Sequence, residues 1–188
     1  MSATPSNMMP LGTKAPSFFL PNPLTKKAND FNSIKGTKVT VVMFICNHCP
    51  FVLHLIKDIS KLGRQFNFPE VAVIAISSND IATHPQDGPE EMAKFSVENN
   101  LSFPYLYDED QSVAKAFDAA CTPDFFVFNK NQKLAYRGQY DDSRPGNDKK
   151  VTGKDLVDAV KALLTGEKVN DKQVPSIGCN IKWKNEQV

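Results

Sequence analysis

A chain of 188 residues, 41% of them hydrophobic and 23% charged, is long enough to bury one core and has the composition of an ordinary globular domain. A net charge of +1 and the absence of a long lysine and arginine run argue against a nucleic-acid-binding protein. No apolar run reaches transmembrane length, and residues 1–16 lack the basic and apolar regions of a signal peptide. We therefore expect a cytoplasmic protein that binds neither nucleic acid nor membrane.

The first half of the chain alternates apolar strands with helices. Residues 39–45 and 71–77 are continuous β-branched and apolar runs, typical of strands that are buried on both faces. The segment between them, 51–66, has the period of an amphipathic helix, with apolar residues at spacings of three and four: Leu53, Ile56, Ile59, Leu62 and Phe66. Residues 88–100 predict a second helix, because Pro89 followed by two glutamates is typical of a helix N-terminus.

The second half of the chain predicts further strands and helices. Strands are expected at 103–107, 124–129 and 133–138, with a hairpin turn at 130–132, and helices at 112–117 and in the segment that ends before Gly166. Thr152 and Asp155 resemble a capping box at the start of that last helix. Asp141, Asp142 and Arg144 are predicted to form a charged turn in solvent.

Strands that alternate with helices, followed by a hairpin and a last helix, indicate an α/β domain built in layers. We predict a single domain over residues 1–188, with its core at about 12–166 and a C-terminal tail, 167–188, that lies over it. In this tail Trp183 is expected to act as an anchor through its large aromatic surface.

Cys46 and Cys49 form a Cys-x-x-Cys at the junction between the first predicted strand and helix, and Pro50 follows. The unpaired N–H groups and the positive end of the helix dipole stabilise an anion, so we expect Cys46 to have a low pKa and to act as the nucleophile. Cys49 lies about one helical turn further on, where it can resolve a mixed disulfide. Pro50 suits the first turn, which has little need of its missing donor.

His48 stands beside the second cysteine. As a cation it would favour the Cys46 thiolate and raise the reduction potential; alternatively it faces solvent and only shapes the loop. Cys46, His48 and Cys49 also offer zinc ligands, but structural zinc usually needs a second closely spaced pair, and Cys121 and Cys179 stand apart. We therefore expect no metal and no cofactor.

Four stretches together carry a family resemblance: APSFFLPN (15–22), the strand leading into CNHCP, PYLYDED (104–110) and CTPDFFVFN (121–129). They resemble the thioredoxin-fold redoxins, in particular the peroxiredoxin-like branch related to alkyl hydroperoxide reductase and thiol-specific antioxidant proteins. The resemblance implies a thioredoxin-like three-layer fold, with a central mixed sheet flanked by helices. It also implies that Pro123 is a cis proline facing the active cysteines and that Thr122 offers backbone bonds to a bound partner.

The remaining cysteines have several interpretations. The resemblance places Cys121 near the Cys46–Cys49 site, where it either passes a disulfide onward or fills a small buried space. Cys179, in the tail, is a resolving thiol that folds back, a partner for Cys121, or an inert surface thiol. His84 is interpreted as a loop histidine.

Departures from the family patterns narrow the function. Thioredoxin has a tryptophan before its first cysteine and a buried aspartate on the preceding strand, where this chain has Ile45 and Thr40. Peroxiredoxins carry Pro-x-x-x-Thr-x-x-Cys, whose threonine position holds Met43 or Cys46 here, and a distant arginine whose site falls near Thr122 and Pro123. These differences argue against peroxide reduction by the usual peroxiredoxin site.

The sequence therefore predicts a thiol–disulfide oxidoreductase that uses the Cys46–Cys49 pair, with a peroxiredoxin-like thiol peroxidase as the alternative. A redoxin-like module that binds a metal or a partner without catalysis is a third hypothesis. The expected partners are a disulfide-bearing protein or a small thiol or peroxide substrate, and a thiol reductant system.

Overall fold

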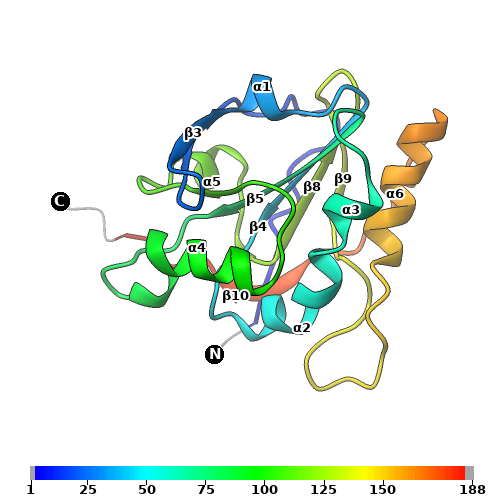
Figure 1. Ribbon diagram of the computed structural model, residues 1–188. Helices are drawn as coiled ribbons and strands as arrows, with labels where there is room; N and C mark the ends of the chain where they lie inside the picture. The colour runs from blue at the N-terminus through cyan, green and yellow to red at the C-terminus, as the bar shows by residue number, and fades with distance from the viewer. Residues whose placement is uncertain (1–2, 185–188) are drawn as a thin grey trace.

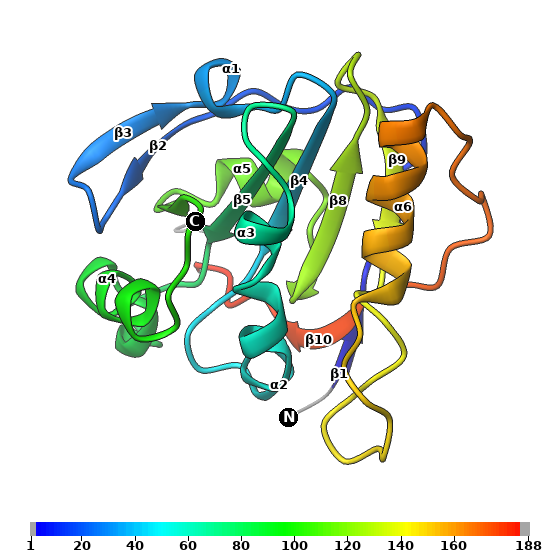
Figure 2. The same cartoon turned by 45° about the vertical axis from the view of Figure 1, so that its right-hand side comes forward.

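The computed structural model describes residues 3–184, and a five-stranded sheet of order β6-β5-β4-β8-β9 lies at its centre (Figures 1 and 2). Its strands are β4 (Val39–Phe44), β5 (Val71–Ser77), β6 (Tyr105–Tyr107), β8 (Asp124–Phe128) and β9 (Leu134–Gly138). β4 pairs parallel with β5 and antiparallel with β8, so the sheet is mixed, as expected. Every residue of β4, β5 and β8 is buried, which explains why these segments are apolar without alternation.

Helices and a hairpin cover the two faces of this sheet. The helices are α1 (Phe31–Ile34), α2 (Pro50–Ile59), α3 (Leu62–Gln65), α4 (Pro89–Glu98), α5 (Ser112–Ala116) and α6 (Lys154–Thr165), with a 3₁₀ turn, η1, at Pro85–Asp87. α2, α4 and α6 share one apolar cluster with alternate residues of β4. α5, Phe31 and the hairpin of β2 (Phe19–Asn22) and β3 (Lys27–Asp30) pack on the other face. The single helix predicted over 51–66 is divided into α2 and α3.

The tail contributes a strand to a second sheet, of order β1-β10-β7. Figure 2 shows β10 beside β1. Its strands are β1 (Ala3–Pro5), β10 (Ile177–Asn180) and β7 (Cys121–Thr122), and β10 is antiparallel to both neighbours. β10 approaches β7 so closely that a Cβ atom on Gly178 would lie 1.9 Å from the Thr122 carbonyl oxygen. The tail therefore lies over the domain, as predicted, and does so through a specific strand pairing.

The backbone beyond β10 is held by polar side chains. Asn79 Oδ1 accepts a hydrogen bond from Lys182 N at 2.8 Å, and Gln111 bonds both Lys182 O and Lys184 N at 2.8 Å. Trp183 is 41% exposed, so its ring is only partly covered, and its role as an anchor of the tail stays a prediction. Within residues 3–184, no helix is long and apolar enough to cross a membrane.

The predicted charged turn is partly buried and organises the start of α6. Asp141 is 2% exposed, and its carboxylate accepts hydrogen bonds from the backbone N–H groups of Ser143, Thr152 and Gly153 at 2.6–2.9 Å. The N-cap of α6 is Gly153, and Asp155 accepts a bond from Gln139 Nε2 at 2.6 Å. The predicted capping box is wrong, because Asp141 reaches across the loop to bond these donors itself. The predicted solvated turn is wrong for Asp141 and correct for the exposed Asp142.

Asp141→Ala and Asp142→Ala form a matched pair that tests this arrangement. Removing the Asp141 carboxylate leaves three backbone donors without their acceptor, and we expect the free energy of unfolding to fall by about 2–4 kcal/mol. Asp142 is an exposed residue that pairs with Lys149, so its substitution should leave stability nearly unchanged. Urea denaturation of both variants gives the comparison; equal losses would contradict the assignment.

Candidate active site

Cys49, rather than Cys46, lies at the start of α2. β4 ends at Phe44, Cys46 follows in the loop, and Cys49 is the N-cap residue before Pro50. Proline at the first helical position lacks only an N–H that has no intrahelical partner, so the helix begins there without cost. The helix terminus therefore acts most directly on the second cysteine, where the sequence analysis expected it to act on the first.

Three cysteine sulfurs meet at this helix terminus. Cys49 Sγ lies 2.9 Å from Cys179 Sγ, and the neighbouring Cys46 thiol would donate a hydrogen bond to an ionised Cys49. The Cys49 thiol, when protonated, donates to the Thr122 carbonyl oxygen at 3.1 Å. Cys46, Cys49 and Cys179 are only 1%, 0% and 3% exposed. The structure thus brings together both cysteines of the motif and the tail cysteine, and all three are shielded from solvent.

The two cysteines of the motif have opposite acidities. The hydrogen bond from Cys46, together with the Cys179 thiol and the Val52 backbone N–H, lowers the pKa of Cys49 to about 5 despite its burial. Donating that bond, being buried and lying near the Asp87 carboxylate all raise the pKa of Cys46. In the reduced protein these interactions favour the thiolate on Cys49, whereas the sequence analysis expected it on Cys46.

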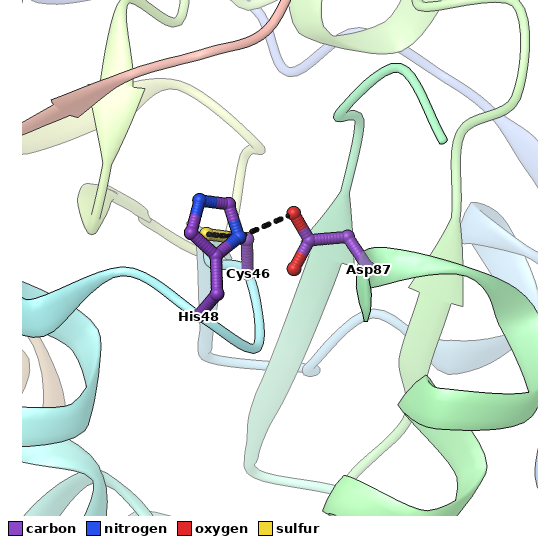
Figure 3. Close-up of side chains that lie close together, drawn as sticks. All are labelled: Cys46, His48 and Asp87. Atoms are coloured by element: carbon purple, nitrogen blue, oxygen red, sulfur yellow. Dashed lines mark hydrogen bonds and ion pairs between the residues drawn. The ribbon is translucent and has the colours of Figure 1, made fainter. Parts of the chain in front are cut away.

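His48 is held by a buried carboxylate (Figure 3). Its Nδ1 lies 2.7 Å from Asp87 Oδ2 and 3.9 Å from Cys46 Sγ. Its side chain is 19% exposed, and its ring stacks on that of His84 with centroids 5.1 Å apart. His48 is therefore fixed beside Cys46 and does not simply face solvent, and a positive charge on its ring would lie against an anion.

Asp87 and Tyr105 are site residues that the sequence analysis missed. Asp87, on η1, also accepts hydrogen bonds from Asn47 N and Asn79 Nδ2, each at 2.8 Å. Tyr105, on β6, donates to Asn47 Oδ1 at 3.1 Å. Together they fix both residues between the cysteines. No spacing links these positions to the Cys-x-x-Cys, so only the tertiary fold reveals them.

Thr122 and Pro123 lie against the cysteines, as the resemblance implied. The Thr122–Pro123 peptide bond is cis, which confirms that expectation. Thr122 Oγ1 lies 3.4 Å from Cys46 Sγ. The backbone of Thr122, expected to bind a partner, is paired here with Cys179 of the chain's own tail.

Cys121 and Asp124 lie close to the site but take no direct part in the sulfur cluster. The buried Cys121 thiol donates to Pro123 O at 3.6 Å, and burial together with the nearby Asp124 carboxylate raises its pKa. Burial also raises the pKa of Asp124 to about 7, although its carboxylate accepts a bond from Ala120 N at 3.2 Å. Thr40, which takes the place of the thioredoxin aspartate, bonds Gln132 and Gly36 instead.

Cys46, His48 and Asp87 also form a group that could hold a metal ion, since their ligand atoms lie within 4.8 Å of one another. The third member differs from the Cys49 that the sequence analysis considered. His48 Nδ1 and Asp87 Oδ2 are 2.7 Å apart, a hydrogen-bond distance. An ion about 2.0 Å from each atom would need them further apart in a tetrahedral site. The His48–Asp87 distance is therefore that of a hydrogen bond and shorter than two ligands of one tetrahedral ion would be.

The chain is similar to a known protein family and to several solved structures. The sequence model described as AhpC/TSA family matches residues 11–137. No curated protein matches the chain significantly.

Two solved structures match almost the whole chain. An uncharacterized conserved protein from Geobacillus kaustophilus is 50% identical with a TM-score of 0.96, over 99% of this chain and 98% of that one. A hypothetical protein from Sinorhizobium meliloti is 44% identical with a TM-score of 0.94, over 97% and 99%. A putative thioredoxin from Neisseria meningitidis, 23% identical over 84% and 95% with a TM-score of 0.62, shares the fold. The thioredoxin-like fold is thus confirmed.

The acidity of Cys49 is tested with Cys46→Ala and Cys46→Ser. Alanine removes the thiol that donates to Cys49, so the pKa of Cys49 should rise clearly above the wild-type value of about 5. Serine keeps a donor, so the rise should be smaller. Ultraviolet absorbance of the thiolate, followed against pH in the reduced proteins, measures the pKa of Cys49 in both variants. Cys121→Ser is the control. A wild-type Cys49 that titrates near the ~8.5 of a free thiol would contradict the assignment.

Asp124→Asn tests the buried carboxyl through the pH dependence of stability. A folded-state pKa of about 7 against 3.8 means that the native state binds the extra proton between these values, so wild-type stability should fall as pH rises through this range. The gap of about three pKa units corresponds to at most about 4 kcal/mol. Asparagine cannot ionise, so the variant should lose this slope. Urea denaturation at pH 5 and pH 8 measures the free energy of unfolding of both proteins. The same change between the two pH values in both would contradict a raised pKa at Asp124.

Proposed function

The chain belongs to the AhpC/TSA family, and from this premise we propose that it is a thiol–disulfide oxidoreductase whose redox couple is Cys46 and Cys49. Membership of this redoxin family carries thiol oxidoreductase or peroxidase chemistry in general. The observation that supports the finer assignment is the position of the two cysteines against Thr122 at the N-terminus of α2: Cys49 is the N-cap residue with Sγ 3.1 Å from Thr122 O, and Cys46 Sγ lies 3.4 Å from Thr122 Oγ1. The lowered pKa of Cys49 agrees with this placement. A thiolate next to a second thiol is the arrangement that two-step disulfide exchange needs.

The proposed reaction begins at Cys49. Its thiolate attacks one sulfur of a substrate disulfide, so a bond from Cys49 to the substrate forms while the substrate S–S bond breaks. The released thiolate takes a proton from solvent. Cys46 then loses its proton and attacks Cys49, which forms the Cys46–Cys49 disulfide and releases the second substrate thiolate. Two electrons have passed from the protein to the substrate. A thiol reductant then reduces the Cys46–Cys49 disulfide by the reverse steps.

His48 is proposed to assist the deprotonation of Cys46. Its Nδ1 donates to the Asp87 carboxylate at 2.7 Å and lies 3.9 Å from the Cys46 sulfur, so a cationic ring would stabilise the Cys46 thiolate while the proton leaves to solvent. Because the pKa of Cys46 is raised, its deprotonation is the step at which this help is most needed. In this proposal His48 serves the resolving thiol, whereas the sequence analysis assigned it to the attacking one.

Peroxide reduction is the alternative, and the positions of the arginines argue against it. The chain has three arginines, and all of them bond groups outside the sulfur cluster. Arg64 donates to Asn100 O, Arg137 to Met9 O and Gln173, and Arg144 to Asp141 O and Gln139. A peroxidase of the usual peroxiredoxin type would need such a cation beside the reactive thiolate.

The proposed partners are a disulfide-bearing protein or small disulfide and a thiol reductant system. A reducing compartment such as the cytosol suits this proposal, because it would supply the thiol reductant.

Turnover of a model disulfide with a small dithiol as reductant tests the function. Cys46→Ser and Cys49→Ser should each lower kcat/KM by roughly 100-fold or more, because exchange needs both sulfurs. Cys121→Ser should retain activity. Hydrogen peroxide is added to the reduced protein in parallel, with sulfenic acid trapped for mass spectrometry. Rapid sulfenic acid formation, combined with disulfide exchange no faster than that of a free thiol, would replace this proposal with the peroxidase.

A further inference from the structure

Cys179 stands where the sulfur of a bound substrate would be expected. β10 pairs Cys179 with Thr122, and the two sulfurs of Cys49 and Cys179 are 2.9 Å apart. A further approach of about 0.9 Å would bring them to the ~2.05 Å of a disulfide bond. Both side chains are buried, so the pair is enclosed within the fold.

Several contacts hold β10 in this position. Gly178 allows the strand to approach the Thr122 carbonyl oxygen, where a Cβ atom would lie only 1.9 Å away. The Ser176 hydroxyl donates to Pro123 O at 2.7 Å, and beyond the strand Lys182 N donates to Asn79 at 2.8 Å. On its other edge β10 pairs with β1. The tail is therefore fitted to the cis-proline loop on both sides of Cys179.

We propose that Cys179 is a third redox-active thiol and that Cys49 exchanges its disulfide partner between Cys46 and Cys179. This inference rests on the proposed function, which supplies the Cys46–Cys49 disulfide. Cys179 loses its proton and attacks Cys49 Sγ; the Cys49–Cys179 bond forms as the Cys46–Cys49 bond breaks. Cys46 leaves as a thiolate and takes up one proton, matching the one released. No net oxidation occurs, because one disulfide is exchanged for another.

The exchange links the chemistry to the position of the tail. In the Cys49–Cys179 form, β10 is covalently held across the edge of β7, where the backbone of Thr122 would otherwise pair with an incoming peptide. Cys46 is then a free thiol beside His48 and can attack Cys49 to release the tail. Cys179 thus acts as an internal substrate that closes the site, and Cys46 reopens it.

Disulfide mapping tests this exchange. Wild-type protein, Cys46→Ser and Cys46→Ser/Gly178→Ala are oxidised with diamide, free thiols are blocked with N-ethylmaleimide, and peptides are identified without reduction. Cys46→Ser should form an intramolecular Cys49–Cys179 disulfide. Adding Gly178→Ala, which obstructs docking of β10, should lower its yield by roughly tenfold or more through lost proximity. The control is Cys46→Ser/Val174→Ala, because Val174 lies just before β10 and is 54% exposed.

The outcomes separate this inference from the proposed function. A Cys46–Cys49 disulfide in wild-type protein, with Cys179 still alkylated in oxidised monomeric Cys46→Ser, overturns the third thiol and leaves the oxidoreductase standing. A Cys49–Cys179 disulfide without any Cys46–Cys49 disulfide in wild-type or Cys179→Ser protein would overturn the proposed couple. Circular dichroism of the Gly178→Ala protein and its ability to form the Cys46–Cys49 disulfide show whether it is folded.

Discussion

The Cys49 sulfur sits where three distant parts of the chain converge on one helix terminus. The loop after β4 brings Cys46, the strand β7 brings the carbonyl of Thr122, and the tail brings Cys179. Each contact either donates to the sulfur or accepts its proton, so the protonation state of Cys49 depends on all three segments being in place. A displacement of the tail would therefore change the acidity of the site as well as its cover.

The strands and helices of the core follow from local sequence. The segment 71–77 coincides with β5, since burial on both faces leaves a continuous apolar run in a single stretch of sequence. The predicted helix 51–66 divides near Ser60, where the chain turns between α2 and α3. The apolar spacing continues through this turn, so periodicity alone did not reveal it.

The motif residues of the site could be predicted from the sequence, but the residues that hold them in place could not, because they meet only through tertiary contacts. The Cys-x-x-Cys and Thr122–Pro123 carry short motifs that imply their meeting. Asp87 carries none: it bonds Asn47 and His48 only because η1 folds against the loop after β4. β10 likewise has no apolar period that marks a strand in the sequence. Its partner β7 has just the two residues Cys121 and Thr122, too few to predict as a strand. The low pKa was predicted for Cys46 because the sequence does not show at which residue the helix begins; in the structure its N-cap is Cys49.

Burial sets a condition on every reaction of Cys49. The sulfur is fully shielded, so an external disulfide can reach it only after a covering segment moves. β10 meets β7 through the two pairs that Cys179 and Asn180 make, whereas β4 and β5 share six pairs inside the core. Segments with short ladders open at lower free energy than the core. The tail is therefore a cover that would open at lower cost than the core strands, and a disulfide to Cys179 would close that route.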